Sequence, residues 1–241
     1  MFEKLPLTAR KILAWSVHLV TATGAIWGFL TLLAIFEQNW RMMIMWMIVA
    51  MFVDGFDGIL ARWFHVKEYA KGVDGGLMDN IIDYLNYVVV AAFILIKAPD
   101  LMPDGLELPA AFSILLTSAY QFSQVDAKTD EQSFFFKGFP SLWNFLVVYL
   151  MLLQLNPWVN LFILIIFNIL VFVPVKYLYP TRSTRLRRLT LALTYLYGVI
   201  GAWGLLQYPS VPQWVMWVSM VYVGYYALLS FFPRIGGIKL A

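Results

Sequence analysis

The chain has 241 residues, of which 61% are hydrophobic and only 13% are charged. This composition excludes an ordinary soluble domain and is typical of a protein with several membrane-spanning segments. The chain contains no cysteine, which excludes disulfides, a thiolate metal site and a cysteine nucleophile, and its net charge is only +3.

Long apolar runs follow one another along the whole chain. A transmembrane helix needs roughly 20 apolar residues, with a range of about 17–25. Runs near this length lie at 12–36, 41–62, 77–97, 108–124, 140–155, 157–175, 189–207 and 213–232. They lack the alternation of β-barrel strands, and no linker or internal repeat separates them. We therefore predict an all-α integral membrane protein, a bundle of about eight transmembrane helices in which residues 1–241 form a single domain.

The distribution of positive charge predicts the orientation of this bundle. Loops on the cytoplasmic side of a membrane are enriched in lysine and arginine. If the N-terminus is cytoplasmic, all but two of the 17 lysine and arginine residues lie on that side, the exceptions being Arg41 and Lys97. This bias favours an even number of spans, with the N- and C-termini both in the cytoplasm.

Four aspartates lie at the cytoplasmic edge of the second and third runs. Asp54 and Asp57 are three residues apart and Asp79 and Asp83 are four apart, so on helices each pair shares a face. Carboxylates at the edge of hydrocarbon are costly and usually functional. Four of them close together would repel unless some hold protons or cations neutralise them. The spacing therefore predicts an all-oxygen site for two Mn²⁺ or Mg²⁺ ions.

The residues around the aspartates suit a phosphate ligand. Gly55, Gly58 and Gly75 lack side chains where a bulky ligand could approach the backbone. The guanidinium of Arg62 can bind phosphate oxygens with two hydrogen bonds. A carboxylate left partly free of metal could take a proton from an attacking hydroxyl, and Asp83, the deepest, is our candidate. For any single aspartate, an N-cap or a solvated position is the simpler alternative.

Segment 54–83 resembles the signature of the CDP-alcohol phosphotransferase family. In that signature two aspartates precede a glycine, an alanine–arginine pair and a spacer, and a second glycine precedes two further aspartates. The matching residues are Asp54, Asp57, Gly58, Ala61, Arg62, Gly75, Asp79 and Asp83. The spacer has twelve residues instead of the usual eight, and the usual number of spans is six. Both departures look like a bacterial branch of the family that uses choline.

The resemblance implies a reaction and residue roles. The phosphatidyl group of CDP-diacylglycerol would pass to choline, giving phosphatidylcholine and CMP, at the cytoplasmic face of a bacterial inner membrane. Asp54, Asp57 and Asp79 would hold the metals, and Asp83 would contact one metal and act as the general base. The CDP-lipid would be bound by Gly58, Ala61, Arg62 and Gly75.

Two further basic residues are candidates for the lipid phosphates. Lys137 precedes a Gly138-Phe139-Pro140 element that is similar to one in related family members. Arg182 begins a basic run that ends at Arg188 and that could instead set the topology and contact anionic lipids.

Choline carries a permanent positive charge, which proteins usually hold with aromatic faces. We predict Tyr84, Tyr120 and Trp143 for this role, although each could instead be a packing residue.

Alternative functions and partners follow from the same residues. A sibling phosphatidyltransferase would use serine, inositol or glycerol phosphate in place of choline. An ion or solute transporter could also use intramembrane aspartates, but the clustering of the four at one surface argues against it. Gly24 and Gly28 could support helix contacts within or between protomers, so a homodimer is possible. Membrane lipid is an expected partner and nucleic acid is not.

Overall fold

The computed structural model describes residues 2–124, 135–173, 176–178 and 187–231. Most of these residues are helical, and a helix lies on each of the eight apolar runs, which confirms the all-helical prediction. The elements are η1 (Phe2–Lys4), α1 (Leu7–Phe36), α2 (Trp40–Trp63), α3 (Val66–Tyr69), α4 (Gly75–Asp83), η2 (Tyr84–Val89), α5 (Val90–Lys97), α6 (Glu107–Ser123), β1 (Phe135–Lys137), α7 (Trp143–Leu153), α8 (Pro157–Phe172), β2 (Lys176–Leu178), α9 (Arg187–Leu205) and α10 (Gln213–Phe231). The antiparallel ribbon of β1 and β2 is an addition that the hydrophobic pattern did not predict.

Three helical segments of the described chain are long and apolar enough to cross a membrane. They are α1, α2 and the continuous stretch Gly75–Lys97, which comprises α4, η2 and α5. The surface is also rich in exposed large hydrophobic side chains, such as Leu116 at 72% and Val221 at 74% exposure. Hydrocarbon tolerates such a surface and water does not. The chain is therefore an integral membrane protein, while eight crossings and cytoplasmic termini stay predictions.

Polar side chains set the start of several helices. The carboxylate of Asp74 accepts hydrogen bonds from the backbone N–H groups of Gly76 and Leu77, both at 3.0 Å, and so caps α4. Asn39 and Asn156 cap α2 and α8 in the same way. The cap at Asp74 fixes where α4 begins, and this start places both later aspartates on one helix.

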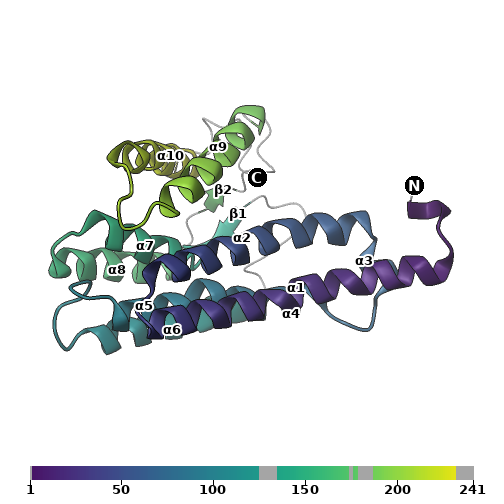
Figure 1. Ribbon diagram of the computed structural model, residues 1–241, viewed down its shortest axis with the longest axis horizontal. Helices are drawn as coiled ribbons and strands as arrows, with labels where there is room; N and C mark the ends of the chain where they lie inside the picture. The colour runs from purple at the N-terminus through teal and green to yellow at the C-terminus, as the bar shows by residue number, and fades with distance from the viewer. Residues whose placement is uncertain (1, 125–134, 174–175, 179–186, 232–241) are drawn as a thin grey trace.

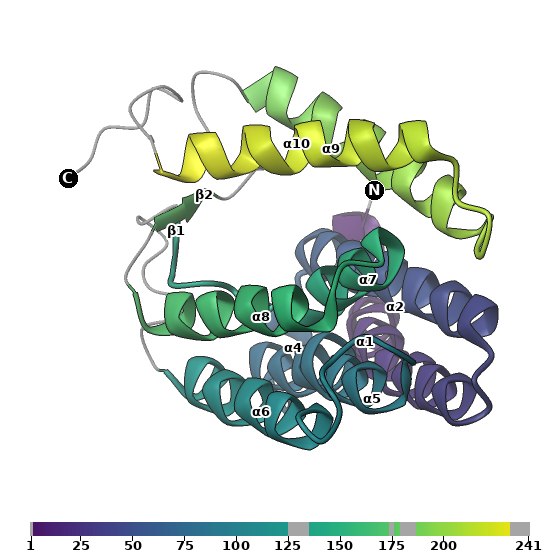
Figure 2. The ribbon, with the colours of Figure 1, turned by 90° about the vertical axis from the view of Figure 1, so that its left-hand side faces the viewer.

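The helices lie in two groups, α1 to α8 and the pair of α9 and α10. Helices α1 and α2 run side by side along the long axis of the molecule, and α4 packs on α1 (Figure 1). Helices α9 and α10 form a pair that lies across the top of the other helices in Figure 2, on the side of α7. The two groups therefore meet along α7 and the adjacent part of α2.

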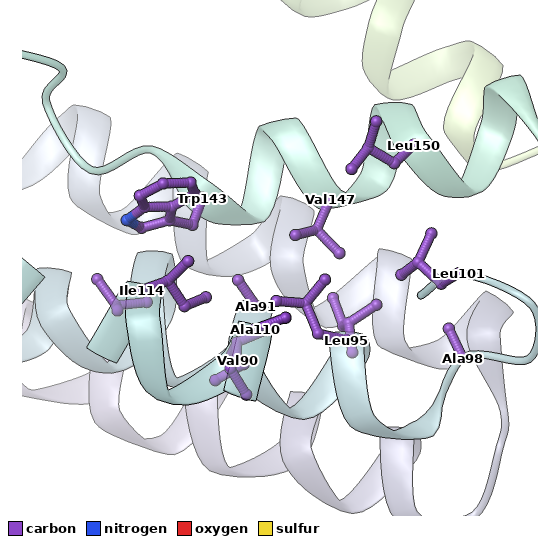
Figure 3. Packing of buried hydrophobic residues seen from close by; sticks show 14 of the residues in the cluster. Val90, Ala91, Leu95, Ala98, Leu101, Ala110, Ile114, Trp143, Val147 and Leu150 are labelled. Atoms are coloured by element: carbon purple, nitrogen blue, oxygen red, sulfur yellow. The ribbon is translucent and has the colours of Figure 1, made fainter. Parts of the chain in front are cut away.

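The main core lies where α5, α6 and α7 meet. Figure 3 shows Leu95, Ile114, Trp143 and Val147 pointing toward one another from these three helices, and each has 0% exposure. This packing anchors α7 and the adjoining third span, which carries Asp79 and Asp83.

Gly24 and Gly28 of α1 lie against other helices of the same protomer. A Cβ atom added to Gly24 would lie 2.5 Å from Cγ2 of Ile82, and one added to Gly28 would lie 2.7 Å from Oδ1 of Asn86. The absence of a side chain at both positions therefore allows α1 to approach α4 and η2 closely. These contacts account for both glycines without a second copy of the chain, and a homodimer stays a prediction.

Candidate metal and substrate site

Three of the four predicted aspartates come together. Asp54 and Asp57 lie in the last three turns of α2, and Asp79 lies on α4. Each offers a carboxylate oxygen, and the three oxygens all lie within 4.8 Å of one another. Asp57 is buried, with 8% exposure, and the other two are half-buried. The prediction that paired spacing on two helices would bring carboxylates together is confirmed for these three.

The donor set of this carboxylate triad fits a divalent cation. Three hard oxygen donors in a partly buried position are what Mg²⁺ and related ions prefer. Opposite ligands of one such ion lie about 4.2 Å apart, twice a metal–oxygen distance of about 2.1 Å. The three carboxylate oxygens all lie within 4.8 Å of one another, so their spread is comparable to this span. The triad therefore fits a divalent cation.

Two hydroxyl groups hold the triad, and neither was predicted. The hydroxyl of Tyr87 donates a hydrogen bond of 2.7 Å to Oδ2 of Asp54. The hydroxyl of Thr21, on α1, hydrogen-bonds to the carboxylate of Asp57. Tyr87 follows Asp83 by four residues, and this spacing could have revealed it. Thr21 has no comparable signal, because only the packing of α1 on α2 brings it to the site.

Asp83 lies beside the triad and is not a member of it. It is the last residue of α4, and it is half-buried. The carboxylates of Asp54, Asp79 and Asp83 all interact electrostatically with Tyr87, which places Asp83 in the same neighbourhood. The chain continues from Asp83 directly into η2, a turn of π-helix. π-Helical turns are rare in proteins, and those that occur often lie at functional sites.

The remaining motif residues occupy the end of α2 and the start of α4. Arg62 is exposed, and a Cβ atom at Gly58 would lie 3.6 Å from its Nη1 atom, so the guanidinium folds back along the helix toward the aspartates. A Cβ atom at Gly75 would lie 3.1 Å from Cε1 of His18. Gly75 thus has a packing reason to lack a side chain, in addition to the predicted space for a nucleotide. Ala61 packs against a small buried cluster beneath α3.

The two predicted basic residues are not placed at the site. Arg182 lies outside the described residues. The backbone of Lys137 ends β1, where it pairs with Lys176 of β2, and its side chain lies outside the described part of the structure. Gly138 follows with φ = 77°, and a Cβ atom there would collide with the carbonyl oxygen of Val171. Only glycine can therefore occupy position 138 of this element.

Comparison with known proteins agrees with this site. Residues 15–173 match the family model described as CDP-alcohol phosphatidyltransferase. The chain belongs to this family. The match extends over α1 to α8, including all four aspartates, and ends before α9 and α10.

Several relatives of similar length are named phosphatidylcholine synthase. The chain is 39% identical over 236 residues to phosphatidylcholine synthase of Legionella pneumophila, with 95% of this chain and 92% of the relative covered. It is 39% identical over 210 residues to that of Mesorhizobium japonicum, covering 85% and 77%. It is 36% identical over 239 residues to that of Rhizobium johnstonii, covering 98% and 97%.

Each of the three aromatic residues predicted for choline has its own packing or hydrogen-bond partner in the structure. The hydroxyl of Tyr84 donates to the carbonyl oxygen of Leu115 at 2.9 Å, which ties its ring to α6. Trp143 has 0% exposure, and its Nε1 donates to Oγ of Ser118 at 2.7 Å. Tyr120 is 51% exposed and packs on α8. No described contact joins the three side chains into one cage.

Proposed function

We propose that this protein is a phosphatidylcholine synthase, which transfers the phosphatidyl group of CDP-diacylglycerol to choline and releases CMP. The observation that carries the proposal is the grouping of Asp54, Asp57 and Asp79 in a chain whose full-length relatives bear that name. The charge bias of the loops supports a site at the cytoplasmic face, and the bacterial relatives support the inner membrane.

Asp54, Asp57 and Asp79 would hold two divalent ions, Mn²⁺ or Mg²⁺. When bound, such ions polarise a diphosphate and stabilise a phosphate leaving group. The protein supplies the geometry: Tyr87 orients the carboxylate of Asp54, and Thr21 orients that of Asp57. The carboxylate oxygens, held in this way, would ligate the metals.

Other residues act on the two substrates. Arg62 folds back toward the aspartates and would bind the diphosphate of the donor. Gly58, Ala61 and Gly75 would leave space beside it for cytidine, with Lys137 and Arg182 as further phosphate ligands. The hydroxyl oxygen of choline attacks the phosphorus of the phosphatidyl group, and the bond from that phosphorus to the CMP oxygen breaks.

Asp83 takes the proton of the choline hydroxyl as the new bond forms. Its place beside the triad and outside it supports this role, because a carboxylate not fully engaged by metal keeps a lone pair for the proton. The ammonium group of choline is attracted by the carboxylates and by aromatic ring faces, for which Tyr84, Tyr120 and Trp143 are the candidates.

The test uses purified protein in detergent with CDP-diacylglycerol, Mn²⁺ and one alcohol at a time. We expect CMP and phosphatidylcholine with choline, and loss of both with EDTA until Mn²⁺ or Mg²⁺ is restored. CMP release with serine, inositol or glycerol phosphate and not with choline would keep the reaction class and refute the acceptor. Metal-dependent solute flux into proteoliposomes without any CMP would favour a transporter instead.

A further inference from the structure

An apolar cavity lies between the family helices and the C-terminal helix pair. Ile44 and Met51 of α2 and Val148 of α7 line one wall, and Ala202 of α9 and Val215 of α10 line the other. The few polar groups in the lining include the hydroxyls of Tyr149 and Tyr197, which bond to each other at 3.0 Å. The lining residues carry no charge, so the cavity offers a surface that matches hydrocarbon and has no ligand for the phosphates of a nucleotide.

One end of this cavity adjoins the carboxylate triad. Phe145, which lines the cavity, stacks on Tyr87 with ring centroids 6.3 Å apart, and Tyr87 donates to Asp54. Met51 lies three residues before Asp54 on α2, or about 4.5 Å along the helix axis. A phosphate held at the triad would thus have the cavity directly beside it.

The stretch of α2 that lines the cavity has a length comparable to one lipid chain. Ile44, the lining residue of α2 farthest from Asp54, lies ten residues before it, which is about 15 Å along the axis. The hydrocarbon core of a bilayer is about 30 Å thick, so one leaflet accounts for about 15 Å. An acyl chain attached to a lipid whose phosphate is at the triad would extend over the same distance.

The outer wall of the cavity belongs to the part of the chain beyond the family match. Helices α9 and α10 follow residue 173, where that match ends. On α9, Gly198 and Gly201 line the cavity, and a Cβ atom added to either would meet nothing within 4 Å. Since no close neighbour requires glycine at these positions, the two residues leave free space on this wall.

We propose that this cavity receives one acyl chain of CDP-diacylglycerol, and that Gly198 and Gly201 set its width. The proposal rests on the proposed function, because it assigns part of that donor to the cavity. Lipid tails are as apolar as the cavity, so hydrophobicity alone does not hold the chain there. The cavity acts by fit: a chain that cannot enter it displaces the diphosphate from the triad.

The test narrows the cavity and varies the length of the donor chain. Gly201→Leu and Gly198→Leu are made singly, with Gly224→Leu as the matched control, since Gly224 lies on α10, is equally open and does not line the cavity. CMP release with choline is measured for dioleoyl and dioctanoyl donors in the same detergent. We expect kcat/KM for the dioleoyl donor to fall about tenfold or more in both cavity variants, since small displacements at a reacting centre are costly.

The dioctanoyl donor provides the internal check on folding. We expect its kcat/KM to change by less than about twofold in the cavity variants, and Gly224→Leu to leave both donors unaffected. An equal loss with both donors, or no loss with either, would overturn the assignment. The measurement is repeated with bilayer lipid added to the detergent; if the effect of the variants then depends on this lipid and not on the donor, a bulk lipid chain occupies the cavity and the assignment is overturned. If the wild-type protein released no CMP with the dioleoyl donor and none with the dioctanoyl donor, the proposed function itself would be refuted.

Discussion

Replacing Tyr87 by phenylalanine removes a single hydroxyl from the carboxylate triad. That hydroxyl donates a 2.7 Å hydrogen bond to Oδ2 of Asp54, while the ring stacks on Phe145. Phenylalanine keeps the ring and its stacking partner. The substitution therefore isolates the orientation of Asp54 from the packing of η2 against α7.

The expected size of the effect follows from the charge of the acceptor. A hydrogen bond to an ionised group contributes about 1.5–3 kcal/mol. Since every 1.4 kcal/mol is tenfold in an equilibrium constant, metal affinity should weaken by roughly 10–100-fold, the range found for groups that orient metal ligands. At saturating metal, kcat should change much less, because the three carboxylates and Asp83 are all still present.

The assay is a titration of Mn²⁺ against CMP release, with direct Mn²⁺ binding followed by EPR. The matched control is Tyr225→Phe, which also removes a hydrogen-bonded hydroxyl (2.8 Å from Oγ1 of Thr190) but on α10. We expect the Mn²⁺ requirement to rise only for Tyr87→Phe. An unchanged Mn²⁺ titration in that variant, with turnover intact, would refute the idea that the hydroxyl orients a metal-binding carboxylate.

Three further substitutions test the remaining parts of the site and its frame. Asp83→Asn should lower kcat by about 10²–10⁴-fold while Mn²⁺ binding and the melting temperature are kept; near-normal turnover would mean that another group is the base. Thr21→Val should raise the Mn²⁺ requirement by about tenfold through Asp57, with Thr21→Ser restoring it, and a failure of serine to rescue would point to packing alone. Gly138→Ala should destabilise the protein, as measured by thermal unfolding in detergent, by more than Gly105→Ala. Both glycines have φ near 80°, which costs about 1–2 kcal/mol for alanine, but only position 138 also lacks space, so equal losses would contradict the steric argument.

Much of the candidate site was predictable because its signals are local. Spacings of three and four residues put Asp54 beside Asp57 and Asp79 beside Asp83 on helix faces, and the motif joined the two helices. Hydrophobic run length predicted the helices themselves, because each helix satisfies its own backbone hydrogen bonds within the run. These features depend on residues close in sequence, so a sequence is sufficient to show them.

Contacts between helices distant in sequence could not be predicted in this way. Trp143 is of a residue type that often binds ligands, yet on α7 it is fully buried and its Nε1 donates a hydrogen bond to Ser118 of α6. Gly24 and Gly28 have the spacing of a dimer contact, yet Ile82 and Asn86 of the same protomer fill the space beside them. A residue type and a spacing do not say which partner covers a face.

The sequence by itself determined that this is a helical membrane protein with a carboxylate motif at the ends of two helices. Only the tertiary structure decided that Thr21 and Tyr87 hold two of those carboxylates, that Asp83 lies just outside the triad, and that the last two helices close an apolar cavity beside it. The physical reason is that periodicity specifies which face of a helix is apolar or charged. The partner that this face meets depends on how all the helices pack together.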